Sequence, residues 1–322
     1  MTNLDIKDKK LLYEMDLNAR LGTSKLGKLI GLSQESTHYR LNRLKEKKVI
    51  FHNITLINFS KLGYTGYGVY ARFNSIDKKS KKETIDYLIK NPNIYWVAEF
   101  GGKFDLAFAI MAKNIQEFNF FYSEITTELN EFLKDFTVSI RVELTQFPRN
   151  YLLQNKKNDK SPKFGKIEKL YILDETEEEI LKVLSKNARI PVLEISEKIK
   201  KPASTISEKI KKLEKESIIQ GYSSEIYCQE YEYESYQLFL NTQNLTKKNK
   251  EQLYLYCQNN PNIIFLIETV GKWNFEIIYE VKNQKQLQEL IIEIRTRFQN
   301  IITNLETIVL FNHYVKYNQY PL

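Results

Sequence analysis

The sequence has few of the residues from which catalytic and metal sites are built. Its 322 residues include two cysteines and three histidines. Cys228 and Cys257 show no pair motif and no zinc spacing, and the histidines are scattered without a carboxylate or cysteine pattern. No glycine-rich phosphate loop, nucleophile elbow or HExxH motif occurs. We therefore predict no catalytic residues, no metal ion and no cofactor.

Long apolar runs are also missing. No segment approaches the roughly 20 apolar residues that a membrane-spanning helix needs. The first ten residues, MTNLDIKDKK, are polar and lack the apolar centre of a signal peptide. We expect a cytoplasmic protein with reduced cysteines and no membrane partner. Hydrophobic residues make up 42% of the chain, enough for several cores, and the net charge of +8 permits a polyanionic partner without requiring one.

The chain contains an internal repeat that needs no gap. Asn18-Ala19-Arg20 recurs as Asn187-Ala188-Arg189, an offset of 169 residues, and Asn91-Pro92-Asn93-Ile94 recurs at the same offset. The two copies cover residues 4–153 and 173–322. Residues 154–172 between them are polar and lysine-rich, which is typical of a linker. This basic linker could be a solvated tether or could follow a phosphate backbone.

The first part of each copy, residues 1–60 and 173–229, has the pattern of a winged helix-turn-helix. Residues 5–17 show an apolar helical face, and a second short helix follows. A glycine turn then leads to Ser33, a good N-cap for a third and basic helix. The alternating segment 51–59 predicts a strand pair, the wing. A third helix of this kind fits the DNA major groove.

The apolar pattern also predicts which side chains of the first copy face the protein. We expect Ile6 and Leu11 in the first helix, and Leu41 and Leu44 in the third, to point inward. The arginines and lysines of the third helix are expected to point outward, toward phosphates or guanine bases.

The second part of each copy, residues 61–153 and 230–322, predicts a ferredoxin-like domain. Alternating and apolar segments indicate strands, and amphipathic segments between them indicate helices, in the order βαββαβ. The helix after the third strand is expected to run from Ile115 to Lys134. The predicted fold is therefore α+β, with two winged helix-turn-helix domains and two ferredoxin-like βαββαβ domains in tandem.

Several motifs together resemble the Lrp/AsnC (feast/famine) family of transcriptional regulators. They are Leu-Asp-x-x-Asp at 4–8, Asn-Ala-Arg at 18–20, Gly-Leu-Ser at 31–33, Arg-Leu-x-Arg-Leu at 40–44 and Val-Ile at 49–50. The resemblance implies sequence-specific binding to double-stranded DNA, modulated by a small ligand such as an amino acid that binds to the second, RAM-type domain. It also implies that the two copies pair as a pseudo-dimer within the chain, which could associate further.

The third helix of each copy supplies the candidate DNA contacts, because its side chains can hydrogen-bond to base edges or bind phosphates. The candidates are Gln34, Ser36, Thr37, His38, Tyr39, Arg40, Arg43 and Lys45 in the first copy and Ser204, Thr205, Ser207, Lys209, Lys211 and Lys212 in the second.

The two predicted reading heads differ in charge. Residues 1–60 carry eleven basic and six acidic residues, a net charge of +5, whereas residues 170–229 carry ten and eleven, a net charge of −1. Glu208 stands where the first copy has Tyr39, and Pro202 stands where it has the capping Ser33. The second head is therefore expected to bind DNA more weakly or to read a different half-site.

The turn between the second and third strands of each ferredoxin-like domain supplies the candidate ligand contacts that the resemblance implies. The candidates are Gly101, Gly102, Lys103 and Asp105 in the first copy and Gly271, Lys272 and Trp273 in the second. Asn274 replaces the aspartate in the second copy. The glycines could instead serve only a turn with positive φ.

Three other functions fit the same architecture. A fused sirohaem decarboxylase would be similar, but that resemblance calls for a His-Cys-Tyr-type stretch in the second ferredoxin-like strand. This chain has YWVAE at residues 95–99 and FLIET at residues 265–269 there. A non-specific architectural DNA-binding protein would show steep salt dependence and little sequence preference. A protein-interaction module that has lost DNA binding is the third, and the acidic second head fits it.

Overall fold

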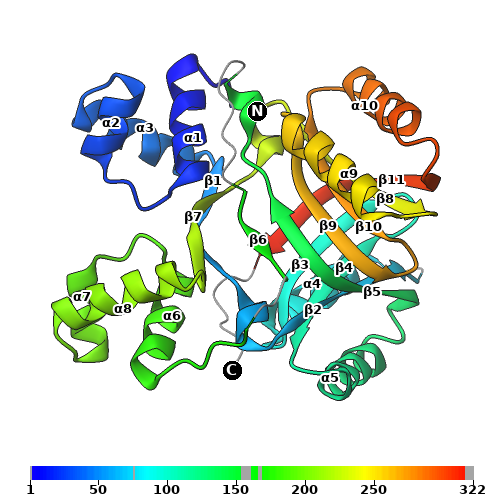
Figure 1. Cartoon of the computed structure of the whole chain (residues 1–322), viewed down its shortest axis with the longest axis horizontal. Helices are drawn as coiled ribbons and strands as arrows, with labels where there is room; N and C mark the ends of the chain where they lie inside the picture. Colours follow the sequence, from blue (N-terminus) through cyan, green and yellow to red (C-terminus); the bar gives the residue numbers. More distant parts are fainter. Residues whose placement is uncertain (1, 75–76, 154–160, 166–168, 316–322) are drawn as a thin grey trace.

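Two helical heads and one β-barrel make up the molecule. The computed structural model describes residues 2–74, 77–153, 161–165 and 169–315. Both heads lie on the same side of the barrel (Figure 1). Among the described helices, none combines the length and apolar character that crossing a bilayer requires.

Each head contains three helices and one strand. In the first head these are α1 (Ile6–Leu17), α2 (Thr23–Ile30), α3 (Gln34–Glu46) and β1 (Ile50–Ile57). In the second they are α6 (Glu175–Lys186), α7 (Val192–Ile199), α8 (Ala203–Lys215) and β7 (Ile219–Ile226). Local sequence explains the helix ends, because an aspartate capping box begins α1 and α6. Gly31, at a φ of 71°, ends α2, and Ser33 caps α3.

The wing differs from the strand pair predicted within each head. Each head has a single strand, and β1 pairs antiparallel with β7 of the other head, with Ile50 opposite Ile226 and Ile57 opposite Ile219. One strand cannot satisfy its own backbone N–H and C=O groups, so each head takes its partner strand from the other copy. The heads are thereby joined by a shared two-stranded sheet.

The barrel is a closed ring that contains strands of both copies. Its strands follow the order β2-β4-β3-β11-β8-β10-β9-β5, and β5 also pairs with β2 to close it. The two copies meet where β3 pairs with β11 and β5 with β9. A short strand, β6 (Lys163–Phe164), adds to β5. The other bounds are β2 (Thr65–Phe73), β3 (Ile94–Gly101), β4 (Leu106–Ala112), β5 (Leu133–Gln146), β8 (Glu234–Thr242), β9 (Ile263–Gly271), β10 (Phe275–Val281) and β11 (Ile302–Val315).

Four helices connect the barrel strands, so that each copy has the predicted order βαββαβ. They are α4 (Lys78–Lys90), α5 (Ile115–Glu128), α9 (Lys247–Asn259) and α10 (Gln284–Arg297). The helix predicted from Ile115 to Lys134 is therefore too long, because β5 already begins at Leu133. The outward faces of the strands form one core with α4 and α5 and a second core with α9 and α10. The inward faces form a further aromatic cluster, which includes Tyr70, Phe104, Phe239 and Trp273.

The contacts between the copies come in matched pairs. The backbone N–H of Ala19 donates to Tyr222 O (3.0 Å), and that of Ala188 donates to Asn53 O (3.2 Å). Both residues of each bond are exchanged by the offset of 169, which is the behaviour of a two-fold axis. The two copies thus pair with each other inside one chain.

Candidate nucleic-acid interface

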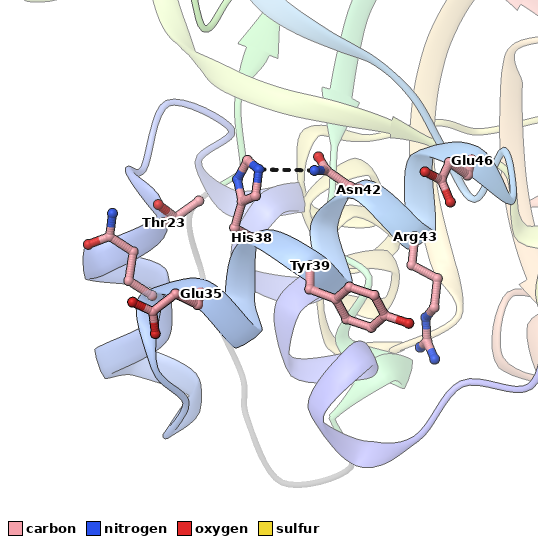
Figure 2. Close-up of a pocket in the computed structure, with 8 residues that line it drawn as sticks. Thr23, Glu35, His38, Tyr39, Asn42, Arg43 and Glu46 are labelled. Carbon is pink, nitrogen blue, oxygen red and sulfur yellow. Dashed lines mark hydrogen bonds between the residues drawn. The ribbon is translucent and has the colours of Figure 1, made fainter.

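The exposed face of α3 carries a group of polar and aromatic side chains. Gln34, Ser36, His38 and Tyr39 are exposed, as the sequence predicts, and Tyr39 is 69% exposed. Figure 2 shows this face, with Tyr39 and Arg43 on it and His38 turned toward Asn42. The ring Nε2 of His38 lies 3.0 Å from the Asn42 side-chain nitrogen. These side chains are not used in the core of the head.

Asn42 belongs to this face but was not among the predicted contacts. It lies four residues after His38, so both project from the same side of the helix. That spacing alone could have identified it. Glu35, Glu46 and Thr23 of α2 lie beside the same surface, so the face is not uniformly basic.

Thr37 is a correction to the predicted set of DNA contacts. Its side chain is fully buried, and its hydroxyl donates a hydrogen bond to Ser33 O (2.7 Å). Thr37 precedes Leu41 by four residues and Leu44 by seven, so it shares their inward face.

Arg40 and Arg43 lie at this surface, partly exposed, but they form ion pairs that the sequence pattern did not predict. Arg40 Nη1 lies 2.7 Å from Asp5 Oδ2 and 2.8 Å from Asp8 Oδ1. Arg43 forms an ion pair with the other oxygen of Asp8, which is almost completely buried. Hydrogen bonds to Asp5 and Asp8 raise the pKa of Arg40. The two arginines therefore fasten α3 to α1, and their charges are largely compensated within the head.

The second head repeats this arrangement with lysines. Lys209 forms an ion pair with Asp174, and Lys212 Nζ lies 2.8 Å from Glu177 Oε1. Lys209 and Lys212 are therefore engaged in ion pairs within the head, although Lys212 is as exposed to solvent as Ser204 and Lys211 are. Thr205 and Ser207 are half-buried. At the start of α8, Pro202 makes no side-chain cap, so the N-terminal turn lacks the bond that Ser33 supplies to α3.

Three basic residues gather where the heads meet. Arg189 donates to Ala19 O and to Leu21 O (2.9 Å), and Arg20 reaches back to Ile190 O (3.3 Å). Partial burial and the charge of Arg189 lower the pKa of Lys45, a predicted DNA contact at the end of α3. The repeated Asn-Ala-Arg motif therefore holds the two heads together. This is a role that the sequence pattern did not reveal, because the carbonyls that accept these bonds lie in the other copy.

The predicted ligand turn of the first copy is used for contacts between the copies. A Cβ on Gly101 would lie 2.6 Å from the Phe311 ring, and Gly102 has a φ of 120°. Lys103 forms an ion pair with Glu306 of β11, and the Asp105 carboxylate accepts a hydrogen bond from Phe73 N (2.9 Å). Gly101 is thus explained by the close approach of the Phe311 ring, and Gly102 by its positive φ.

The corresponding turn of the second copy behaves in the same way. Gly271 has a φ of 148°, and a Cβ there would lie 2.8 Å from Val138 O. Trp273 is buried in the barrel, where its indole donates to Glu276 Oε1 (2.9 Å). Lys272 is exposed, and its carbonyl accepts a bond from the Asn241 side chain (2.6 Å). Trp273 lies next to Phe104 of the first copy's turn, with the two ring centroids 5.9 Å apart in the aromatic cluster of the barrel. In the described residues, no group of three or more His, Cys, Asp or Glu side chains is placed to hold a metal ion.

Comparison with solved structures identifies proteins with the same fold. The sirohaem decarboxylase NirDL aligns over 96% of this chain and 92% of its own, with a TM-score of 0.60 and 13% identity. The same enzyme in complex with an iron-uroporphyrin III analogue gives a TM-score of 0.61 at 14% identity, over 97% of this chain and 93% of its own. At such low identity the similarity concerns the fold.

Sequence comparison identifies the family. A model of the AsnC-type helix-turn-helix domain matches residues 4–45, and a model of winged helix-turn-helix DNA-binding domains matches residues 173–220. An uncharacterized HTH-type transcriptional regulator of Pyrococcus furiosus is 33% identical over 116 residues, which cover 35% of this chain and 77% of that protein. The HTH-type transcriptional regulator FL11 of the same organism is 32% identical over 120 residues, covering 37% of this chain and 77% of that protein. The chain belongs to the Lrp/AsnC family of HTH-type transcriptional regulators, with the family's unit present twice.

Proposed function

We propose that this regulator binds double-stranded DNA in a sequence-specific way and that α3 is its principal recognition helix. The proposal rests on the observation that α3 has two groups of side chains with different contacts. Arg40 and Arg43 hold the helix against α1, which leaves the exposed side chains of Gln34, His38, Tyr39 and Asn42 to meet base edges. Asparagine and glutamine can bind adenine through two hydrogen bonds, and such contacts carry sequence information.

The second head plays a lesser part in this proposal. Both heads lie on the same side of the barrel (Figure 1), so one DNA segment could meet both. The second head has a net charge of −1 against +5 for the first, and DNA affinity depends strongly on positive charge near phosphates. We therefore propose that α8 with Ser204, Thr205, Ser207 and Lys211 supports binding, whereas α3 sets the sequence preference.

The test compares equivalent positions in the two heads. Asn42→Ala should weaken binding to the specific site about tenfold, because a lost bidentate base contact is worth roughly 1–3 kcal/mol. Lys211→Ala, at the corresponding position of α8, should weaken specific and non-specific binding alike and by less. If Asn42→Ala leaves the ratio of specific to non-specific affinity unchanged, α3 does not read bases. A wild-type ratio near one would instead favour the architectural alternative.

The proposal includes modulation by a small effector, such as the amino acid that the family resemblance implies. DNA affinity measured with and without each amino acid tests this part, and affinities that never change would contradict it.

The proposal also includes a location in the cytoplasm, where the DNA is. Further association of chains belongs to the same proposal and is measured by sedimentation.

An enzyme is the second candidate, because the fold similarity to NirDL extends over almost the whole chain. We favour the non-enzymatic function, since the relatives of matching sequence are named transcriptional regulators. Incubation with sirohaem distinguishes the two functions. A haem-like absorption band that stays with the protein through gel filtration, followed by conversion of the tetrapyrrole, would overturn the non-enzymatic function.

A further inference from the structure

A cavity opens at one end of the barrel, in the first copy. Its volume is about 140 Å³, close to the roughly 150 Å³ of an engineered cavity that binds benzene. It lies between the inward face of the sheet and β6 of the linker. The walls are mainly apolar and aromatic, and they include Tyr64, Tyr95, Met111, Phe164 and Phe265. Two charged residues of β5, Arg141 and Glu143, also line the cavity. A ligand about the size of one aromatic ring fits this cavity.

Arg141 supplies the positive charge of the cavity wall. Its Nη1 donates to the Tyr95 hydroxyl (2.6 Å), while its Nε is cut off from solvent and has no hydrogen-bond partner. A guanidinium group has five N–H donors. Within the described part of the chain, no carboxylate lies within ion-pairing distance of Arg141. Burial opposes its charge, but Tyr95 and Glu276 raise the pKa of Arg141, so the group stays cationic.

The surrounding sequence makes room for this arginine. Arg141 lies across Gly66 and Gly68 of β2, and a Cβ on Gly66 would be 2.9 Å from the Tyr95 hydroxyl. The corresponding positions of the second copy hold Ser235, Gln237 and, in place of the arginine, Leu310.

The matching region of the second copy already contains its carboxylates. Glu280, the counterpart of Met111, lies 2.9 Å from Arg149 Nε, and Asp16 lies 2.7 Å from Arg149 Nη1. One end of the barrel thus joins an arginine to two carboxylates of the protein. At the other end Arg141 has no ion-pair partner among the described residues, although Glu143 also lines that cavity.

We propose that this cavity is a binding site for a small aromatic carboxylate. The carboxylate binds the guanidinium group of Arg141, and the ring lies among the aromatic walls. Arginine binds carboxylates in a planar, two-bond geometry, and such charge-assisted bonds are strong where water is excluded. The apolar walls contribute the burial of the ring. Only the first copy has the arginine, so the site occurs once per chain.

Phe164 of β6 and Gly165 line this site, and β6 connects it to the second head. A Cβ on Gly165 would lie 2.1 Å from Val142 O, so only glycine permits the close approach of the linker to β5. The N–H of Lys163 donates to Gln220 Oε1 (2.7 Å), and Gln220 belongs to β7, the strand that follows α8. A ligand under Phe164 therefore contacts a segment tied to that head. This coupling rests on the proposed function, but the site itself does not.

The test is calorimetric titration of the full chain, without DNA, using benzoate as the probe. Benzoate should bind in a saturable way with one site per chain, and at least tenfold more tightly than the neutral benzyl alcohol, since charged hydrogen bonds contribute about 1.5–3 kcal/mol. Arg141→Leu should weaken benzoate binding at least tenfold; leucine stands at the same place in the second copy. Arg72→Leu, the same change at an exposed position of β2, should leave it unaltered.

Two outcomes would overturn the site: no saturable binding of benzoate, or equal binding by Arg141→Leu and the wild type. If Arg141→Leu does not fold, Arg141→Lys serves instead, because it keeps the charge and loses the planar fork. It should bind benzoate more weakly than the wild type, and equal binding would count against the role of the guanidinium. Because DNA is absent, failure here leaves the proposed function untouched, and failure of DNA binding leaves this result standing.

Discussion

Arg149 joins the first head to the barrel. Its side chain is buried between Asp16 of α1 and Glu280 of β10, and its backbone N–H donates to Asp16 Oδ2 (2.9 Å). Burial by itself opposes the charge of the guanidinium, but the two carboxylates raise the pKa of Arg149. Tyr151 donates a further hydrogen bond to Glu280. The partners are more than 130 residues away in the sequence, so no local pattern could have predicted them.

Removing this arginine should destabilise the protein strongly. Arg149→Met leaves two carboxylates buried without a counter-charge, and breaking such a pair costs about 3–5 kcal/mol. Denaturant unfolding measures the loss. The control is Arg72→Met, whose exposed pair with Asp135 at 3.7 Å should contribute less than about 1 kcal/mol. Equal effects of the two substitutions would mean that the buried network does not stabilise the fold.

At the scale of helices and strands, the sequence predicted most of the secondary structure and less of its pairing. Periodicity located the helices and the order βαββαβ, because an apolar face is a local property. Periodicity gave wrong expectations where contacts between residues far apart in the sequence determine the structure. Ile6, expected to point inward, is 67% exposed, and each wing strand pairs with the other copy.

The candidate interface was predicted in part for the same reason. The exposed side chains of α3 follow from its N-cap and its period, but the ion pairs of Arg40 and Arg43 do not. A repeated spacing could have revealed them: acidic residues three apart begin both first helices, and basic residues three apart lie in both third helices. The buried position of Thr37 was available from its spacing to Leu41.

One helix end in the second head carries backbone strain that the first head avoids. Lys200 ends α7 with a φ of 56°, whereas Gly31 ends α2 in the same conformation. A side chain in this left-handed region costs about 1–2 kcal/mol, part of which the greater freedom of unfolded glycine offsets. Lys200→Gly should therefore raise the free energy of unfolding by up to about 1 kcal/mol. Lys201→Gly is the control, because Lys201 has no positive φ, and it should not stabilise. A lower free energy of unfolding for Lys200→Gly than for the wild type would contradict this backbone strain.

An exposed glutamate of α8 leads to a further prediction at this scale. Glu208 is exposed where the first head has Tyr39, so its charge faces the same side as the proposed DNA contacts. Glu208→Gln should tighten DNA binding roughly two- to fivefold at moderate salt and less at high salt. Glu289→Gln, an equal charge change on α10 of the barrel, should have little effect. Unchanged affinity of the Glu208 variant would mean that α8 does not approach DNA.

The whole molecule is a pair of related units that have diverged at matching positions. The shared wing sheet, the exchanged Ala19 and Ala188 bonds and the closed barrel follow a two-fold relation. The surfaces do not follow it, because the heads differ in charge and only one end of the barrel presents Arg141. A symmetric dimer of identical chains favours a symmetric operator. An unequal pair in one chain is suited to an asymmetric one.

A footprint of the purified chain on the DNA upstream of its own coding region, at about physiological salt and with non-specific competitor, tests the central claim most directly. We predict a protected stretch that survives the competitor. One half-site should be protected more strongly, and Asn42→Ala should abolish protection of that half first. Loss of all protection under competitor would contradict sequence-specific binding, and equal protection of two identical half-sites would contradict the unequal roles of the heads.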